Sequence, residues 1–340
     1  MNQWHTFLAS QGAVISDNAV LGFGNKEAEL SATANGAILA DLSHLSLLQL
    51  SGEDAVSFLQ GQVTNDVKQL NGSNSQFAGY CNPKGRLLAL FLAYAHDSKL
   101  YLQLDGRLAE AIAKRLRMYV LRSKVVIEDI SASTVRLGVA GTNAEQALAG
   151  LFAGIPQRPL AMSQSGNGLL IRLPGELPRF EIICAVSQAE KLWSELQKSL
   201  KPVGTSNWEW LEIQAGIPNV VPRTQEEFVP QMINLDALDG INYKKGCYTG
   251  QEIVARTHYL GKVKRRTQLA HVSGSNQPQP GEDVLLEGND EAVGKIVRSA
   301  PSPAGGFDVL AELRLESMEA GRLICNGGPL ALSHLPYRLD

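Results

Sequence analysis

The sequence has few of the features that mark metalloproteins, secreted proteins or membrane proteins. Its four cysteines are far apart and form no CxxC pair and no cluster with histidine. This spacing argues against a zinc site, a protein-ligated iron–sulfur cluster and a disulfide framework, so we expect no bound metal. No apolar run reaches the roughly 18 residues of a membrane span, and the N-terminus lacks a basic region followed by an apolar run. We therefore expect a protein of the reducing cytoplasm.

An excess of charge of one sign is also missing. The 340 residues have a formal net charge of −3, and 19% of them are charged. Proteins that bind nucleic acid over a large surface are usually basic, so any contact with RNA here needs a local patch of cations. The length predicts two or three domains rather than one small core.

The hydrophobic pattern predicts two similar α+β regions. Residues 46–130 show a strand, a helix, strands around two turns, an amphipathic helix and a closing strand. This order, β-α-β-β-α-β, is typical of ferredoxin-like folds. Residues 133–201 repeat it at about the same length, which favours an internal duplication.

The rest of the chain has a different pattern. Residues 202–262 are less regular and rich in Pro, Asn and charge, whereas the residues after about 263 form short apolar runs separated by Gly, Pro and Asn. Such runs predict a small β-barrel or sandwich. The expected fold class is α+β, with ferredoxin-like layers followed by a C-terminal β-barrel.

The segment GINYKKGCYTGQEIVART, residues 240–257, contains the strongest candidate for chemistry. Cys247 follows Lys245 and precedes an expected helix start, and both cations and a helix N-terminus favour thiolate over thiol. Cys247 is therefore a candidate reactive residue, with Lys245 as its charged neighbour. The structural alternative, that two glycines shape a turn and the cysteine fills a small gap, is about equally supported by the residues alone.

A second ambiguous feature is the basic run Lys262-Val263-Lys264-Arg265-Arg266. Its cations could bind a phosphate or a polyglutamate tail. Runs of charge more often lie on a solvated strand or loop, and that interpretation is favoured here.

The motif KGCYTGQEIVAR, with FVPQMINLDALDGINY before it, resembles the signature of the YgfZ-type folate-binding proteins, which are relatives of the glycine-cleavage T-protein. LSGEDAVSFLQGQVTNDV, GYCNPKGRLLALF and YVLRSKVVIED agree with it, and the resemblance runs from about residue 40 to the C-terminus. It implies three domains in a ring around a channel for tetrahydrofolate. We assign residues 1–45 and 202–262 to a first α+β domain with the cysteine motif, 46–201 to a ferredoxin-like domain or two copies of it, and 263–340 to the barrel.

The resemblance also implies lost transferase chemistry. T-protein relatives hold the catalytic aspartate in a Gly-Gly-x-x-Asp-Asp segment, and the matching stretch here ends in Ala89 and Leu90. Without that acid, aminomethyl transfer loses its main electrostatic and acid–base aid. Gln214 stands where many relatives carry a pterin-contacting glutamate, so it keeps hydrogen bonding without charge.

The same resemblance suggests which residues hold the folate. Trp208 matches a folate-contacting tryptophan of the family, whereas a second such position falls near Leu45 and is altered. Trp210 is two residues from Trp208, so the two rings point in different directions whether the segment is a strand or a helix, and one of them is expected to be core. Further expected folate contacts, with Gln214, are Tyr248, Gln251 and Arg256.

YgfZ-type proteins are implicated in the folate-dependent assembly or repair of iron–sulfur enzymes, including one that methylthiolates tRNA, and the motif cysteine is thought to be essential. The resemblance thus implies a folate-binding accessory protein with iron–sulfur enzymes or cluster-assembly proteins as partners. Two alternatives stay open. One is a one-carbon transferase or demethylase of the T-protein type, and the other is a direct tRNA-binding module that uses Lys244, Lys245 and residues 262–266.

Overall fold

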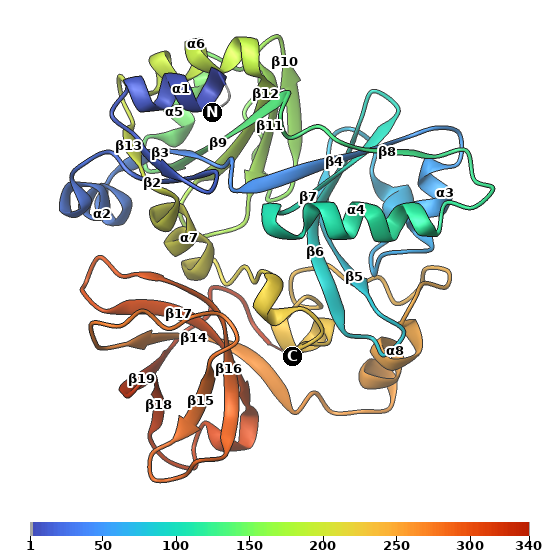
Figure 1. Ribbon diagram of the computed structural model, residues 1–340, viewed down its shortest axis with the longest axis vertical. Helices are drawn as coiled ribbons and strands as arrows, with labels where there is room; N and C mark the ends of the chain where they lie inside the picture. The colour runs from blue at the N-terminus through green and yellow to red at the C-terminus, as the bar shows by residue number, and fades with distance from the viewer. Residues whose placement is uncertain (1–2, 340) are drawn as a thin grey trace.

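The computed structural model describes residues 3–339 and arranges them as three units around a common centre (Figure 1). Two units are built on mainly antiparallel sheets with helices, and the third is a closed barrel. The predicted α+β class with a C-terminal β-barrel is confirmed. Between residues 3 and 339, no helix has the length and apolar character that crossing a bilayer requires.

The first unit is a six-stranded sheet with helices on both faces. Helices α1, α5 and α6 cover one face, where Trp4 and Trp193 pack edge to face at 5.7 Å. Helices α2 and α7 lie on the other side, next to a small hairpin of β1 and β2. The sheet order is β10 (Met162–Ser165), β11 (Gly168–Leu173), β12 (Arg179–Ala185), β9 (Thr134–Gly141), β3 (Ala37–Asp41) and β13 (Lys201–Val203). The other elements are α1 (Gln3–Ser10), β1 (Val14–Ser16), β2 (Ala19–Gly22), α2 (Lys26–Asn35), α5 (Ala144–Ala149), α6 (Val186–Leu196) and α7 (Thr205–Gln214).

The second unit is a five-stranded antiparallel sheet with two helices packed on it. Strands β5 and β6 are almost entirely buried, because the sheet packs both against its helices and against the centre of the molecule. The sheet order is β5 (Ser75–Cys81), β6 (Leu87–His96), β7 (Lys99–Asp105), β4 (Leu45–Ser51) and β8 (Val126–Asp129). The helices are α3 (Ala55–Gln60) and α4 (Ala109–Met118).

The two units repeat one topology. Both follow the order β-α-β-β-β-α-β along the chain, from β4 to β8 and from β9 to β13. The strand orders β5-β6-β7-β4-β8 and β10-β11-β12-β9-β3-β13 differ only by the insertion of β3, so β13 pairs in parallel with β3. Each unit has one strand more than the predicted order, because the segment between its two helices forms three strands joined by two turns rather than two strands. Residues 37–41 join the sheet formed by residues 134–203, and the division of the chain into folding domains stays a prediction.

The third unit is a closed six-stranded barrel with its own apolar core. Its strand order is β14 (Arg265–Val272), β17 (Phe307–Arg314), β16 (Ala292–Pro301), β15 (Asp283–Leu286), β18 (Leu323–Cys325) and β19 (Gly328–Ser333). Between α7 and the barrel, residues 215–250 cross the centre of the molecule with little regular structure and lead into helix α8 (Gln251–Tyr259). Short 3-10 helices lie at Val67–Gln69, Gly106–Leu108, Pro222–Thr224, Pro230–Ile233 and Leu315–Ser317.

Candidate functional site

Trp208 lies at the centre of the molecule on helix α7, and only 2% of the residue is exposed. The helix presses the indole ring onto strand β9 at Gly138, where an added Cβ would lie 2.6 Å from the ring. Any larger residue at that position would displace the ring. The guanidinium of Arg179 lies 5.2 Å from the centroid of the same ring. Trp208 is therefore a firmly packed aromatic surface.

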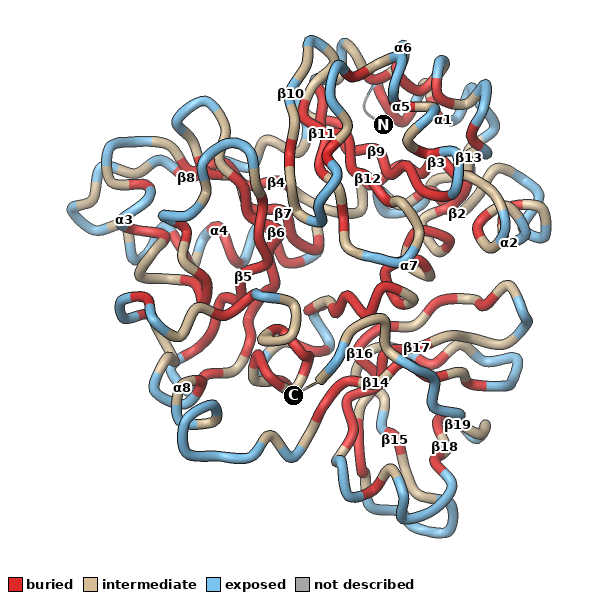
Figure 2. The backbone as a smooth tube through the Cα atoms, turned by 180° about the vertical axis from the view of Figure 1, so that it is seen from behind, coloured by how far each residue is buried: buried red, intermediate tan, exposed pale blue. Residues whose placement is uncertain are grey.

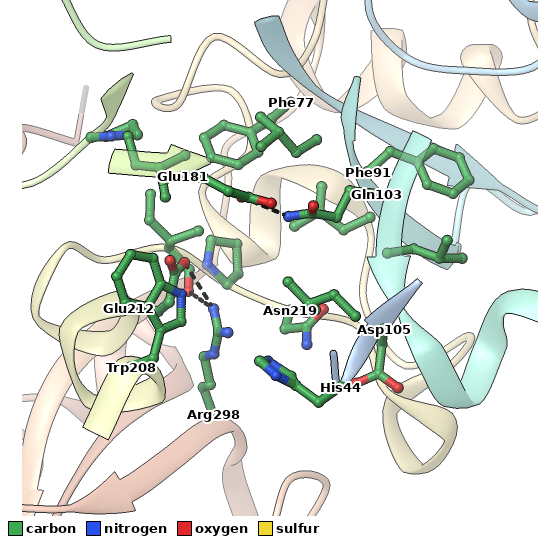
Figure 3. Close-up of a pocket in the computed structure, with 18 of the residues that line it drawn as sticks. His44, Phe77, Phe91, Gln103, Asp105, Glu181, Trp208, Glu212, Asn219 and Arg298 are labelled. Carbon is green, nitrogen blue, oxygen red and sulfur yellow. Dashed lines mark hydrogen bonds and ion pairs between the residues drawn. The ribbon is translucent and has the colours of Figure 1, made fainter. Parts of the chain in front are cut away.

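A cavity of about 600 Å³, its open mouth included, lies beside Trp208 where the two sheets, α7 and the barrel meet (Figure 3). Strand β6 supplies apolar lining, whereas β7, β12, α7 and β16 supply polar groups. The labelled lining residues are His44, Phe77, Phe91, Gln103, Asp105, Glu181, Trp208, Glu212, Asn219 and Arg298.

Glu181 and Gln103 form a polar pair in the wall of this cavity. The Gln103 amide on β7 donates a hydrogen bond of 3.0 Å from Nε2 to Oε2 of Glu181 on β12. Gln103 is 6% exposed and Glu181 is 1% exposed, and Oε1 of each has no hydrogen-bond partner within the described structure. Burial raises the pKa of Glu181 to about 7, against the opposing pull of Arg136. Two buried acceptors without donors are costly, and a ligand with two N–H groups would satisfy them.

The opposite wall is held by an ion network that joins α7 to the barrel. Arg298 on β16 binds Glu209 through Nε at 2.7 Å and Nη2 at 3.0 Å, and its Nη1 lies 3.3 Å from Glu212. Arg179 also donates to Glu212 and to the backbone carbonyl of residue 211. Although burial alone would raise it, Arg298 and His44 hold the pKa of Glu209 well below its usual range. These ion pairs fix the shape of this wall, although Nε of Arg179 keeps no hydrogen-bond partner within the described structure.

Strand β6 presents an aliphatic side chain where the resemblance places the catalytic acid. Leu90 lines the cavity and is 7% exposed, whereas Ala89 is buried and is not among the lining residues. The carboxylates that do line the cavity come from other elements: Asp105 binds Arg107 at 2.7 Å and Glu212 pairs with two arginines, whereas Glu181 pairs with no arginine. No acid from the β5–β6 hairpin within residues 75–96 therefore reaches the cavity.

Cys247 lies outside this cavity, in the loop before α8. It is the exposed cysteine of the chain, whereas the other three are buried. The expected helix start is confirmed, because α8 begins at Gln251. Gly250 precedes it with φ +84°, and an added Cβ there would lie 2.5 Å from the carbonyl oxygen of Asn82. The glycine thus allows the thiol loop to pack on the tip of the β5–β6 hairpin, and the alternative that Cys247 fills an interior gap does not hold.

Lys245 turns away from solvent and binds the backbone. Its Nζ donates to the carbonyls of residues 60, 63 and 65 at 2.7, 2.6 and 2.8 Å, which uses all three ammonium hydrogens. It also lies 5.2 Å from the ring centroid of Tyr248. Burial lowers the pKa of Lys245 to about 8. These hydrogen bonds show that Lys245 holds the thiol loop in place. A catalytic role of Lys245 stays a prediction.

Two residues expected to contact folate face a different hollow. Trp210 Nε1 and Gln214 Nε2 both donate to Oδ2 of Asp308 on β17, at 2.7 and 3.0 Å. Nδ1 of His271 lies 2.8 Å from the other oxygen of that carboxylate. Only Trp208 of the two tryptophans lines the central cavity, because Trp210 is about half a turn further round α7, on the side that packs on the barrel.

The remaining predicted contacts belong to the thiol loop and α8. Tyr248 is 7% exposed, Gln251 is the first residue of α8, and Arg256 is exposed on that helix. None of the three lines the central cavity. The basic run after α8 is also partly engaged, since Arg265 pairs with Glu312 and Arg266 with Asp236.

Comparison with known proteins places these features in a family. Residues 12–166 match the GCVT N-terminal domain family. The tRNA-modifying proteins YgfZ of Serratia proteamaculans and Yersinia pestis (strain Pestoides F) are each 33% identical over 311 residues, which cover 88% of this chain and 92% of theirs. The chain belongs to the YgfZ family. The YgfZ protein of Sodalis glossinidius is similarly 33% identical over 313 residues, 88% of this chain and 93% of its own.

A solved structure supports the same fold. The glycine cleavage system aminomethyltransferase T of Bartonella henselae superposes with a TM-score of 0.76 over 98% of this chain and 96% of its own, at 16% sequence identity. At that identity the likeness concerns the fold alone. The predicted resemblance to YgfZ-type and T-protein-like proteins is thus confirmed at the level of family and architecture.

Three polar residues of this YgfZ-family cavity escaped the sequence analysis. Glu181, Gln103 and Arg298 come from β12, β7 and β16, so no local motif connects them. Each nevertheless leaves a signal, because a strand such as RFEIICA, buried at six of its seven positions, has little reason to carry a carboxylate. A polar or charged residue at a buried position of a mostly apolar strand marks a partner or a ligand.

Proposed function

We propose that this chain binds tetrahydrofolate or a derivative in the central cavity without transferring its one-carbon group. We further propose that it supports the assembly or repair of iron–sulfur enzymes, and through them tRNA methylthiolation, with Cys247 as the working thiol. The observation that carries the folate assignment is the pair of unpartnered, buried oxygens of Glu181 and Gln103 in the cavity that Trp208 also lines.

The chemistry of a pterin matches this wall. The pyrimidine edge of a pterin carries a ring N–H next to an amino group, and a carboxylate can accept both hydrogen bonds. The flat heteroaromatic ring prefers an aromatic surface, which Trp208 supplies. Because Gln103 already occupies one oxygen of Glu181, it orients the carboxylate and leaves its own Oε1 as a further acceptor.

A transferase of the T-protein type is the less favoured function. Leu90 brings no charge to the cavity, and the two other carboxylates in the lining are tied to arginines. Acid–base help to a folate nitrogen needs a carboxyl group that is free to exchange a proton. Glu181 is the one lining carboxylate without an arginine partner, and hydrogen bonding to the pterin edge would occupy it.

The role in tRNA modification is supported by the relatives that are named tRNA-modifying proteins and by the exposed thiol of the KGCYTGQE motif. Direct binding of tRNA by the chain is disfavoured. Of the cations suggested for that purpose, Lys245 is buried on backbone carbonyls and Arg265 and Arg266 are paired with carboxylates.

Ligand binding is tested by fluorescence. Anaerobic titration with tetrahydrofolate should quench tryptophan emission of the wild type, and Trp208→Phe should remove most of the quench because stacked rings exchange energy only at close range. Trp193→Phe is the matched control, since Trp193 is equally buried but lies in the core of the first unit. An undiminished quench in Trp208→Phe would overturn the assignment of the pterin site.

The thiol is tested in cells that lack the protein. Methylthiolated tRNA nucleosides are measured after rescue with the wild type, with Cys247→Ala or with Cys184→Ala, which removes a buried thiol. We expect rescue by the wild type and Cys184→Ala and failure of Cys247→Ala at equal protein level. Full rescue by Cys247→Ala would refute the working-thiol proposal while leaving folate binding untouched.

A further inference from the structure

Helix α8 and Leu260, the residue that follows it, leave apolar side chains partly or largely exposed. Ile253 is 38% exposed, Tyr259 63% and Leu260 85%. Ile253, Arg256 and Leu260 follow one another at i, i+3 and i+7, so they share one side of the helix. On another side of the helix Val254 is 0% exposed, and the His258 ring, although exposed, stacks on Tyr243 at a centroid distance of 3.8 Å. We call Ile253, Arg256, Tyr259 and Leu260 the α8 face.

Free cations surround the α8 face. The hairpin tip that carries Lys84 packs on the helix, because an added Cβ at Gly85 would lie 2.9 Å from Cβ of Ile253. Further cations lie before α8 and along the exposed linker that leads from it to β14 (Figure 2). In the described part of the chain, none of these five exposed cations forms an ion pair: Lys84, Lys244, Arg256, Lys262 and Lys264. The carboxylates exposed nearby are Glu226 and Glu252.

We propose that the α8 face binds an acidic surface of a partner protein and thereby brings that partner to the thiol of Cys247. This inference rests on the proposed function, because it assigns the partner of the same thiol. An exposed apolar stripe rimmed by unpaired cations complements a surface of apolar and acidic residues, in which carboxylates steer the encounter and aliphatic side chains supply buried area. Both features are needed, since charge alone favours rate and specificity more than affinity.

A protein fits this face better than RNA does. Ile253 and Leu260 gain nothing from a phosphate backbone, whereas a protein surface can bury both. An RNA site of useful affinity also needs many phosphate contacts. Three neighbouring cations cannot supply them, because Lys245 binds backbone carbonyls and Arg265 and Arg266 pair with carboxylates. Cys247 lies in the loop that ends at Gly250, and this glycine packs on the same hairpin tip as Ile253. A partner on the α8 face therefore lies next to the thiol.

The test is site-specific photocrosslinking in cells. p-Benzoylphenylalanine replaces Leu260, and in the matched control it replaces Leu121, which is 87% exposed in the segment after α4. We expect a nuclease-resistant protein adduct at 260 that is absent at 121, with its crosslinked segment, mapped by mass spectrometry, rich in Asp and Glu. An adduct that nuclease destroys, or equal adducts at both positions, would overturn the proposal.

Charge reversal completes the experiment. Lys262→Glu/Lys264→Glu should lower the adduct at 260 by about tenfold or more, since like charges across an interface cost at least 1.4 kcal/mol. Lys114→Glu/Arg122→Glu, two exposed cations near 121, should leave it unchanged. An adduct at 260 that resists Lys262→Glu/Lys264→Glu would also overturn the proposal. Quenching of tryptophan emission by tetrahydrofolate is measured in the same proteins. If the wild type forms the adduct but shows no quenching, the folate proposal alone is refuted. If the protein shows quenching but forms no adduct at 260, the docking proposal alone is refuted.

Discussion

Replacing Glu181 with glutamine should stabilise the protein and weaken its ligand binding. The carboxyl has a pKa of about 7 in the fold against about 4.5 in an exposed glutamate, chiefly because it is buried. One pKa unit corresponds to about 1.4 kcal/mol, so ionising Glu181 inside the fold costs on the order of 3 kcal/mol. Glu181→Gln keeps the shape and the hydrogen bond to Gln103 and removes this cost.

The sign of the pH dependence follows from proton linkage. Because the folded chain holds this proton more tightly than the unfolded chain, stability is highest below about pH 4.5 and falls as pH rises toward 7, after which the penalty is constant. The difference in unfolding free energy between Glu181→Gln and wild type should therefore be small near pH 5 and reach about 3 kcal/mol near pH 8.

Urea unfolding at several pH values measures this difference. Glu319→Gln, an exposed carboxylate on the barrel, is the control and should change stability by less than about 0.5 kcal/mol at every pH. A Glu181→Gln difference that does not vary with pH, or a variant less stable than wild type near pH 8, would refute the reasoning. For the same variant, tetrahydrofolate affinity should fall about 10- to 100-fold, since a charge-assisted hydrogen bond is worth about 1.5–3 kcal/mol. Wild-type affinity should rise with pH through 7, and that of the variant should not.

Two further predictions concern the thiol loop. Cys247 should react with a thiol reagent well before the other three cysteines. Those three are buried, and burial raises their pKa values to between about 11 and about 12. Equal rates for all four cysteines would contradict this prediction. Lys245→Met should lower the unfolding free energy, measured in urea, by about 2–4 kcal/mol because three carbonyls lose their charged donor. The control is Lys244→Met, at the exposed neighbouring position, which should change the unfolding free energy by less than about 0.5 kcal/mol. A small effect of Lys245→Met would show that water replaces the ammonium.

Much of the fold could be predicted from local pattern. Apolar runs broken by Gly and Asn predict the barrel, and the repeated order of strands and helices predicts two similar units. Both predictions were possible because each pattern lies within a short stretch of sequence. The insertion of β3 between β9 and β13 could not be predicted. It depends on which strand edges are left open once two distant segments fold, and no local pattern encodes that.

The candidate site was predictable only in part. Trp208 was found through the resemblance, whereas Glu181 and Arg298 converge on it from separate units and need the complete topology. Lys245 illustrates a different limit. From the sequence, a lysine two residues from a cysteine raises the local positive potential, but the fold directs its ammonium to three carbonyls. Sequence spacing gives proximity along the chain and does not give the direction of a long side chain.

The cavity and the thiol are connected by the β5–β6 hairpin. Phe77 and Leu90 line the cavity at one end of it, and Gly85 at its tip contacts Ile253 of α8. The five residue-to-residue steps from Gly85 to Leu90 span about 16 Å in extended conformation. A folate against Trp208 and the thiol of Cys247 are thus better placed to influence each other through the hairpin than by direct contact. The strands of the hairpin are almost fully buried and the hairpin pairs with β7 through β6, so a ligand in the cavity would contact the strand that leads to the α8 face. On the proposed function, a folate dependence of the thiol would then require no one-carbon transfer, which agrees with the aliphatic side chain at position 90.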